Sequence, residues 1–145
     1  MTGLTASGET HLERWFGRLS TGVLATLHPD GRPQLSTVRF AYRDRVARLS
    51  LTETRVKTRN LRHDPRAALY IQPRFEEFFV AEGTAELTAT STTPGDDIGR
   101  ELAAIYEAIA RPHPDRDDYF HAMVADRRLV LRLHVDHIYR GGTDT

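Results

Sequence analysis

Apolar and polar residues alternate along three segments in the first third of the chain, as they do in strands that bury one face. The first two segments, 22–28 and 34–42, flank a turn-forming Pro-Asp-Gly sequence at 29–31. The third segment covers 46–52 and follows a second short polar turn. This pattern predicts an antiparallel meander of three strands.

Three more strands and several short helices are predicted beyond this meander. Gly83 lies inside one of these strands, and an internal glycine usually marks a bulge or a close backbone approach. The predicted strands cover 67–72, 75–87 and 127–139, and apolar residues at helical spacing predict helices over 9–19, 98–109 and 119–124. We therefore expect one mainly β (α+β) domain over residues 1–145, a six-stranded antiparallel Greek-key barrel with short peripheral helices. Residues 1–8 are small and polar and are expected to be flexible.

A basic segment, 53–66, is the most informative part of the sequence. Thr54 is a suitable N-cap, which would place Arg55 and Lys57 in the first turn of a helix. A helix N-terminus with two cations favours a phosphate, and Thr58 and Asn60 add further donors. The alternative is a solvated basic helix face, because three more arginines follow: Arg59, Arg62 and Arg66.

Two polar residues on the second predicted strand suggest a neighbouring binding surface. Gln34 and Ser36 share a face with Val38, whereas Leu35 and Thr37 point the other way. The pair would suit hydrogen bonds to the edge of a heteroaromatic ring, or would simply occupy surface positions. Together with the basic helix start, it favours a site for a nucleotide-like cofactor.

Composition excludes several other classes of protein. The 20 basic and 20 acidic residues cancel, so general nucleic-acid binding is not expected. No apolar run approaches the roughly 20 residues that span a bilayer, and no signal peptide is recognised, so a cytoplasmic protein without membrane contact is expected. The chain lacks cysteine, its histidines are scattered, and no nucleophile lies in an activating motif. We therefore predict no metal site and no catalytic side chain, and we interpret Asp96 as a helix cap.

Four segments carry a resemblance to a known superfamily: GVLATLHPDGRPQLSTVRF, RVKTRNLRHDPRAAL, FVAEGTAEL and DDYFHAMVADRRLVLRLHVDHIY. In this order they resemble the split β-barrel flavin and deazaflavin oxidoreductases, which include pyridoxamine 5′-phosphate oxidase. Within that superfamily the chain is most similar to the PPOX-class F420-dependent oxidoreductases of actinobacteria. The resemblance extends from about residue 21 to residue 139.

The resemblance implies a split β-barrel of the FMN-binding type that forms a homodimer with its cofactor at the subunit interface. The implied cofactor is coenzyme F420, with FMN as the alternative. The implied reaction is hydride transfer from reduced deazaflavin to an unsaturated or quinone-like small molecule. Hydride transfer requires no catalytic acid or base, and a non-catalytic cofactor carrier or sensor is a third interpretation.

The resemblance also implies roles for individual residues. The phosphate would be held by Arg55 and Lys57, with Thr58 and Asn60 nearby, and the ring would be lined by Gln34, Leu35, Ser36 and Val38. Phe78 and Phe79 would come from the other subunit. The cluster of Arg59, Arg62 and Arg66 would meet the polyglutamate tail of F420.

Overall fold

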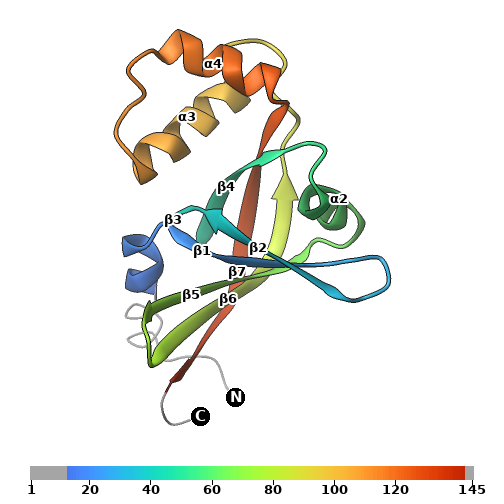
Figure 1. Cartoon of the computed structure of the whole chain (residues 1–145), viewed down its shortest axis with the longest axis vertical. Coiled ribbons are helices and arrows are strands. Elements are labelled where there is room, and N and C mark those ends of the chain that lie inside the picture. Colours follow the sequence, from blue (N-terminus) through green and yellow to red (C-terminus); the bar gives the residue numbers. More distant parts are fainter. Residues whose placement is uncertain (1–12, 143–145) are drawn as a thin grey trace.

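The described part of the chain, residues 13–142 of a computed structural model, is one curled antiparallel sheet with helices at its ends (Figure 1). The segment 1–8 and the start of the helix predicted over 9–19 lie outside the described residues. Helical structure is present at residues 13–18. The remaining elements are β1 (Thr21–Leu27), β2 (Pro33–Arg39), β3 (Ala41–Arg43), β4 (Val46–Thr52), α2 (Val56–His63), β5 (Arg66–Arg74), β6 (Glu77–Leu87), α3 (Asp97–Ile109), α4 (Arg116–Ala125) and β7 (Arg128–Gly142).

The strands follow the order β2-β1-β5-β6-β7-β4-β3, and every hydrogen-bonded pair is antiparallel. The predicted mainly β architecture is confirmed, with seven strands in place of six. The strand predicted over 34–42 is two strands, β2 on β1 and β3 on β4, with Phe40 between them. The Phe40 ring is fully buried and its N–H donates to the Ser20 carbonyl at 2.9 Å, so the chain changes partner at this residue.

The long pair β6–β7 carries the bulge predicted at Gly83. Its register shifts between Glu82 and Gly83, so the prediction is confirmed. A Cβ atom at Gly83 would lie 2.0 Å from the His134 carbonyl oxygen, a separation that only glycine permits. The bulge bends the two strands, which lets the sheet curl around its apolar face.

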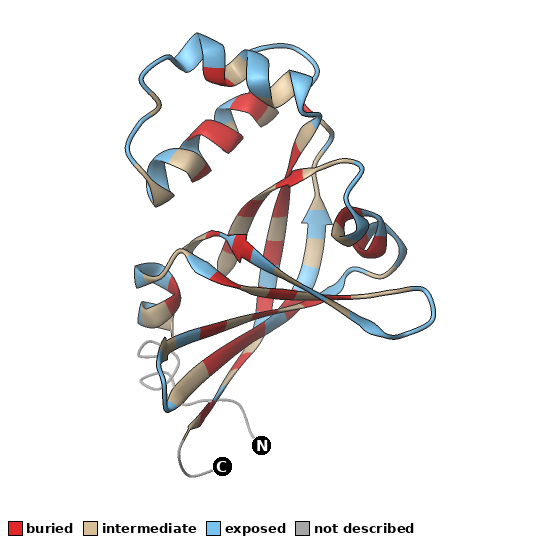
Figure 2. Ribbon diagram, viewed as in Figure 1, coloured by how far each residue is buried: buried red, intermediate tan, exposed pale blue. Residues whose placement is uncertain are grey.

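The curled sheet encloses the main core, and the α3–α4 hairpin forms a second, smaller one (Figure 2). Side chains at alternate strand positions, such as Leu24, Leu69 and Leu131, point inward and are fully buried. Leu102 and Tyr119 pack the two helices onto Val130 at the start of β7. Apolar burial therefore fixes α3–α4 as a lobe on one end of the barrel.

An ion-pair network ties the lobe to the sheet. Arg132 on β7 donates from Nε to Glu101 Oε2 on α3 at 2.9 Å and from Nη1 to Glu86 Oε2 on β6 at 3.0 Å. Arg48 on β4 lies 3.7 Å from the same Glu101 oxygen. Because the network joins three strands to one helix, it fixes the height of α3 above the sheet.

Helix α3 begins after Asp96, as predicted for a capping residue. The carboxylate accepts hydrogen bonds from Gly99 N at 2.8 Å, Thr92 N at 3.0 Å and Ser91 Oγ at 2.8 Å. Burial raises the pKa of the Asp96 carboxyl, but these hydrogen bonds outweigh burial and hold the pKa at about 2. The ionised carboxylate therefore stabilises the start of the lobe.

We expect Asp96→Ala to lower the free energy of unfolding by about 1–2 kcal/mol at pH 7, measured by urea denaturation. The stabilisation is present above the unfolded pKa of about 3.9 and is lost as the pH falls towards the folded value of about 2. The difference between wild type and variant should therefore shrink across that range. Asp117→Ala, an exposed first-turn position of α4, serves as control and should change stability by less than about 0.5 kcal/mol. Equal losses in the two variants would contradict the capping role.

Candidate functional site

Helix α2 begins one residue later than the sequence suggested. Its N-cap is Arg55, which makes no side-chain capping hydrogen bond, so the prediction of Thr54 as N-cap is wrong. The reason is a turn that closes before the helix, with Arg55 N donating to the Thr52 carbonyl at 3.1 Å. Thr58 Oγ1 donates to that same carbonyl at 2.8 Å and anchors the first helical turn to the end of β4.

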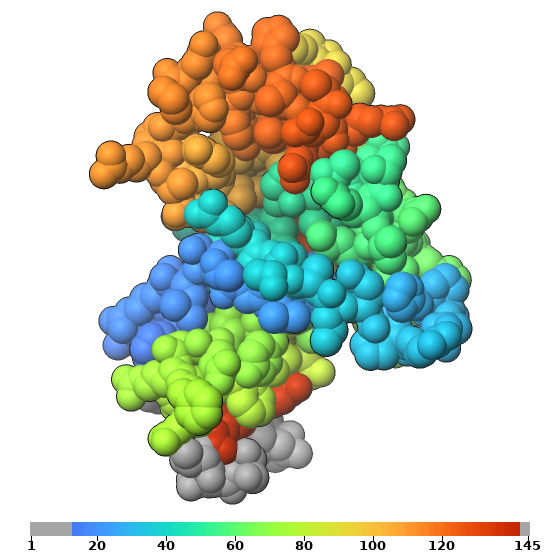
Figure 3. All heavy atoms as spheres, viewed as in Figure 1, coloured from blue at the N-terminus to red at the C-terminus, as the bar shows by residue number. Residues whose placement is uncertain are grey.

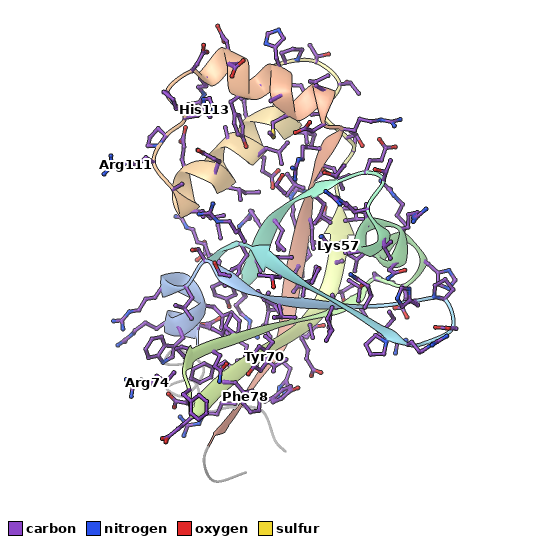
Figure 4. All side chains as sticks on the ribbon, in the orientation of Figure 1. Lys57, Tyr70, Arg74, Phe78, Arg111 and His113 are labelled. Carbon is purple, nitrogen blue, oxygen red and sulfur yellow. The ribbon has the colours of Figure 1, made fainter. Side chains whose placement is uncertain are left out.

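A pocket of about 420 Å³ lies between the start of α2, the edge of the sheet and the α3–α4 lobe (Figure 3). Lys57, which Figure 4 places between α2 and the sheet, lines it. The barrel side consists of Thr37, Val38, Arg39, Ser50, Lys57 and Arg128, and the helical side of Leu102, Ile105, Tyr106, Ile109, Tyr119 and Met123. The lining thus contains three cations, and none of these side chains is a carboxylate.

The charges in the pocket lack compensation. Lys57 and Arg39 form no ion pair with the described residues, and Arg128 reaches only Asp126, at 3.9 Å. Burial lowers the pKa of the Lys57 ammonium below its usual range, and the charges of Arg55 and Arg128 lower it further. Lys57 is also the only lysine in the sequence. An anion in this pocket would relieve both the desolvation and the repulsion.

Two buried polar atoms at the pocket and on β2 lack hydrogen-bond partners among the described residues. They are Arg128 Nε and Ser36 Oγ. Arg128 also donates from Nη1 to Ser50 Oγ at 3.5 Å, the outer limit for a hydrogen bond. Buried polar groups are nearly always paired, so Arg128 Nε, which belongs to the pocket lining, fits a site that a polar ligand completes.

The strand β2 offers a free edge beside the pocket. Among the described strands it pairs with β1 alone, and its residues Thr37, Val38 and Arg39 line the pocket. An edge strand presents unpaired N–H and C=O groups, which suit the edge of a planar heteroaromatic ring. From Arg39 to Leu35 the strand extends about 13 Å, at roughly 3.3 Å per residue.

The predicted ring-lining residues divide between the two faces of β2. Leu35 points outward and is 63% exposed, whereas Gln34, Ser36 and Val38 point inward, and Val38 reaches the pocket. Gln34 Oε1 accepts a hydrogen bond from Thr26 Oγ1 at 3.0 Å. The ring-lining roles stay predictions.

Thr58 and Asn60 are buried inside the fold, at 0% and 4% exposure. Asn60 Nδ2 donates to Thr26 Oγ1 at 3.2 Å and so joins α2 to the network that ends at Gln34. These side chains hold α2 against β1 and β4, and they reach a ligand only through the position that they give the helix.

The two predicted partner-facing aromatics also differ in orientation. Phe79 is fully buried in the core and stacks on Trp15, so its side chain is inaccessible to another molecule. Phe78 points outward and stacks on Tyr70 with 5.4 Å between ring centroids (Figure 4). Of the two side chains, only that of Phe78 is partly exposed.

The predicted cluster of Arg59 and Arg62 on α2 and Arg66 at the start of β5 is partly engaged. Arg66 donates to Asp64 from Nη2 at 2.7 Å, and these hydrogen bonds hold the pKa of the Asp64 carboxyl at about 2. Arg59 and Arg62 are exposed and form no ion pair among the described residues. The helix therefore adds two available cations outside the pocket.

Three pocket residues, Arg39, Ser50 and Arg128, were missed by sequence reasoning. They lie on β2, β4 and β7, and no local spacing joins them. The alternation along β2 argued against Arg39, because it places Arg39 on the face opposite Val38, and yet both residues line the pocket. The apolar residues of the helical wall were interpreted as core, because a wall of a pocket and a core have the same helical periodicity.

Two further findings concern the described residues as a whole. Their His, Asp and Glu side chains form no group of three or more placed to bind a metal ion. Within residues 13–142, no helix has the length and apolarity needed to cross a membrane.

Comparison with known proteins identifies the family. The family described as pyridoxamine 5′-phosphate oxidase matches residues 9–140, nearly the whole chain. The chain belongs to the pyridoxamine 5′-phosphate oxidase family. It is therefore an oxidoreductase of the pyridoxamine 5′-phosphate oxidase-like fold.

Solved structures share the fold of this family member at low sequence identity. An F420 reductase is 24% identical, with a TM-score of 0.64 over 88% of this chain and 94% of that chain. A conserved hypothetical protein from Mycobacterium tuberculosis is 22% identical, with a TM-score of 0.72 over 98% and 88%. An FMN-binding, pyridoxamine 5′-phosphate oxidase-related protein from Nostoc punctiforme is 16% identical, with a TM-score of 0.63 over 97% and 84%.

Because Lys57 is the only lysine, its titration can be followed alone in protein labelled with ¹³C-lysine. We expect its pKa to lie below the ordinary value of about 10.4 and to rise when inorganic phosphate is added, because an anion stabilises the charged form. Ser50→Ala should preserve this rise, since it removes no charge. An unchanged Lys57 pKa at saturating phosphate would place the anion site elsewhere.

Proposed function

We propose that this chain is an F420-dependent oxidoreductase that transfers hydride between the deazaflavin coenzyme and an unsaturated or quinone-like small molecule. The single observation that carries the proposal is the pocket that combines Arg39, Lys57 and Arg128 with no carboxylate among its described lining residues. Such a pocket requires an anionic ligand, and the free edge of β2 beside it suits a planar ring.

The residues present fit a phosphate-bearing flavin or deazaflavin. Lys57 and Arg55 would hold the phosphate at the start of α2, where Lys57 lines the pocket. The ring would lie along β2 towards Leu35. When bound, the reduced cofactor would supply a hydride, and the acceptor would also take up one proton.

F420 is preferred over FMN because of the number of available cations. Two cations adequately neutralise one phosphate, yet the pocket lining holds three cations. Three more, Arg55, Arg59 and Arg62, are exposed on or next to α2. The polyglutamate tail of F420 would meet this excess. Similarity to an F420 reductase agrees, and similarity to an FMN-binding protein keeps FMN as the alternative cofactor.

The protein's contribution to the chemistry would be position and dryness. The described lining residues include no carboxylate or imidazole, and Lys57, whose pKa burial lowers, is assigned to the phosphate, so we assign no general acid or base. The apolar helical wall would exclude water from the transferred hydride. A carrier or sensor of the same cofactor would need no such wall, which favours turnover.

A homodimer is supported by the outer face of the sheet. Val23 on β1 pairs with Thr37 on β2 and with Tyr70 on β5, and Tyr70 pairs with Val80 on β6. Apolar side chains therefore continue across these four strands. This dimer face comprises Leu35, Val23, Ala25, Tyr70 and Phe78, none of which is buried. A second copy would cover it and bring its own Phe78 towards the ring that extends over Leu35.

We expect a homodimer burying more than about 1,000 Å² in total. Leu35→Arg places a charge on the dimer face and should shift the mass measured by light scattering towards the monomer at micromolar concentration. Phe75→Arg is the control, because Phe75 is 92% exposed in the β5–β6 turn outside that face, and it should leave the mass unchanged. A wild-type monomer that still binds cofactor would contradict the dimer.

Fluorescence titrations at two ionic strengths test the cofactor. F420 should bind more tightly than FMN. Salt should weaken the binding of long-tailed F420 more than the binding of the tail-less deazaflavin core, because salt screens exposed ion pairs. Lys57→Ala should weaken both cofactors about tenfold or more. Arg74→Ala, which removes a cation from the far β5–β6 turn (Figure 4), should change neither. If FMN binds more tightly than F420 at both salt concentrations, the assignment of F420 as the cofactor is wrong.

A further inference from the structure

The helical wall of the pocket contrasts with its cationic floor. Its six side chains are Leu102, Ile105, Tyr106, Ile109, Tyr119 and Met123, and none carries a charge. A phosphate, a ribityl chain or a polyglutamate tail would gain little from such a surface. The wall therefore has the chemistry of a site for an apolar ring.

The wall is firmly built. Tyr119 donates from its hydroxyl to the Leu102 carbonyl at 3.0 Å, which locks α4 to α3. His113, in the loop between the helices (Figure 4), packs on both tyrosines, with centroid distances of 5.9 Å to Tyr106 and 5.5 Å to Tyr119. The tyrosine rings are thus supported from behind, and the pocket surface that they form is fixed before any ligand binds.

Arg128 lies between the wall and the cationic floor. Burial lowers the pKa of Lys57, and the charge of Arg128 adds to that effect. Burial raises the pKa of Tyr119, and the charge of Arg128 opposes that rise. Its Nε lacks a hydrogen-bond partner among the described residues, and its nearest carboxylate, on Asp126, is 3.9 Å away. The guanidinium is therefore available to an anion at the edge of the apolar wall.

We propose that the wall and Arg128 form a second subsite, which binds an apolar ring compound bearing one anionic group. This compound is the hydride acceptor, an assignment that rests on the proposed function. Thr37 and Val38 line the same pocket, so a ring on the wall lies beside the strand edge assigned to the cofactor. Lys57 and Arg55 serve the cofactor phosphate, and Arg128 serves the anionic group of the acceptor.

Two fluorescent probes separate the two requirements. 8-Anilinonaphthalene-1-sulfonate carries a sulfonate, and N-phenyl-1-naphthylamine has the same ring systems without charge. We expect the sulfonate to bind to the cofactor-free protein at least about tenfold more tightly. Arg128→Gln should remove most of this preference, whereas Arg127→Gln, an exposed neighbour paired with Glu53, should preserve it.

The apolar wall is tested separately. Ile109→Asn should weaken both probes about tenfold, and Ala108→Asn, an exposed position on the same helix, should weaken neither. Equal binding of the two probes, or a preference that survives Arg128→Gln, would overturn the anionic group. Unchanged binding in Ile109→Asn would overturn the wall.

The subsite and the proposed function fail in different ways. Calorimetry with the sulfonate probe on protein saturated with F420, or with FMN, should give an affinity within about twofold of that of the free protein. Complete competition would show that the whole pocket belongs to the cofactor and would overturn the second subsite. If neither F420 nor FMN binds while the probe results hold, the proposed function fails and the subsite stands as an independent ligand site.

Discussion

The separation of β2 from β4 is the constraint on which the site depends. At Phe40 the chain leaves β1 and joins β4, so β2 ends one side of the sheet and β3 ends the other. The barrel is therefore closed by packing at this point and not by a continuous ladder of hydrogen bonds. Ser50 from β4 and Lys57 from α2 line the pocket at this gap between β2 and β4. In a closed barrel these side chains would have no access to a ligand.

The unusual electrostatics of the pocket follow from this separation. The Arg132 network shows how this chain treats cations that serve structure, since two carboxylates satisfy that guanidinium. Lys57, Arg39 and Arg128 receive no comparable compensation from the described residues. Lys57 and Arg128 are partly buried, so their lack of compensation reduces the stability of the fold, and a ligand anion is the natural source of the missing interaction.

The sequence predicted those features that depend on local pattern. Alternation located the strands, Gly83 located the bulge, and the basic segment located Lys57. The start of α2 was placed one residue early, because a turn closing on Thr52 took precedence over the N-cap preference of Thr54. Thr58 and Asn60 were assigned to the site on residue type, but their burial depends on how α2 packs against β1 and β4.

Other features of the site depend on tertiary structure and had no local signal. Arg39, Ser50 and Arg128 come together only because three strands from distant parts of the chain border one gap. The α3–α4 lobe has the sequence pattern of any amphipathic pair, and only its height above the sheet makes it a wall of the pocket. Phe78 and Phe79 were predicted together, and strand alternation then separated them, one into the core and one onto the surface.

The structure of the protein in complex with F420 tests the central claim most directly. The account predicts a phosphate oxygen within about 2.7–3.2 Å of Lys57 Nζ, with the deazaflavin ring along the free edge of β2. A phosphate bound away from Lys57, with no part of the cofactor or its acceptor in the pocket beneath α3 and α4, would contradict the proposed site.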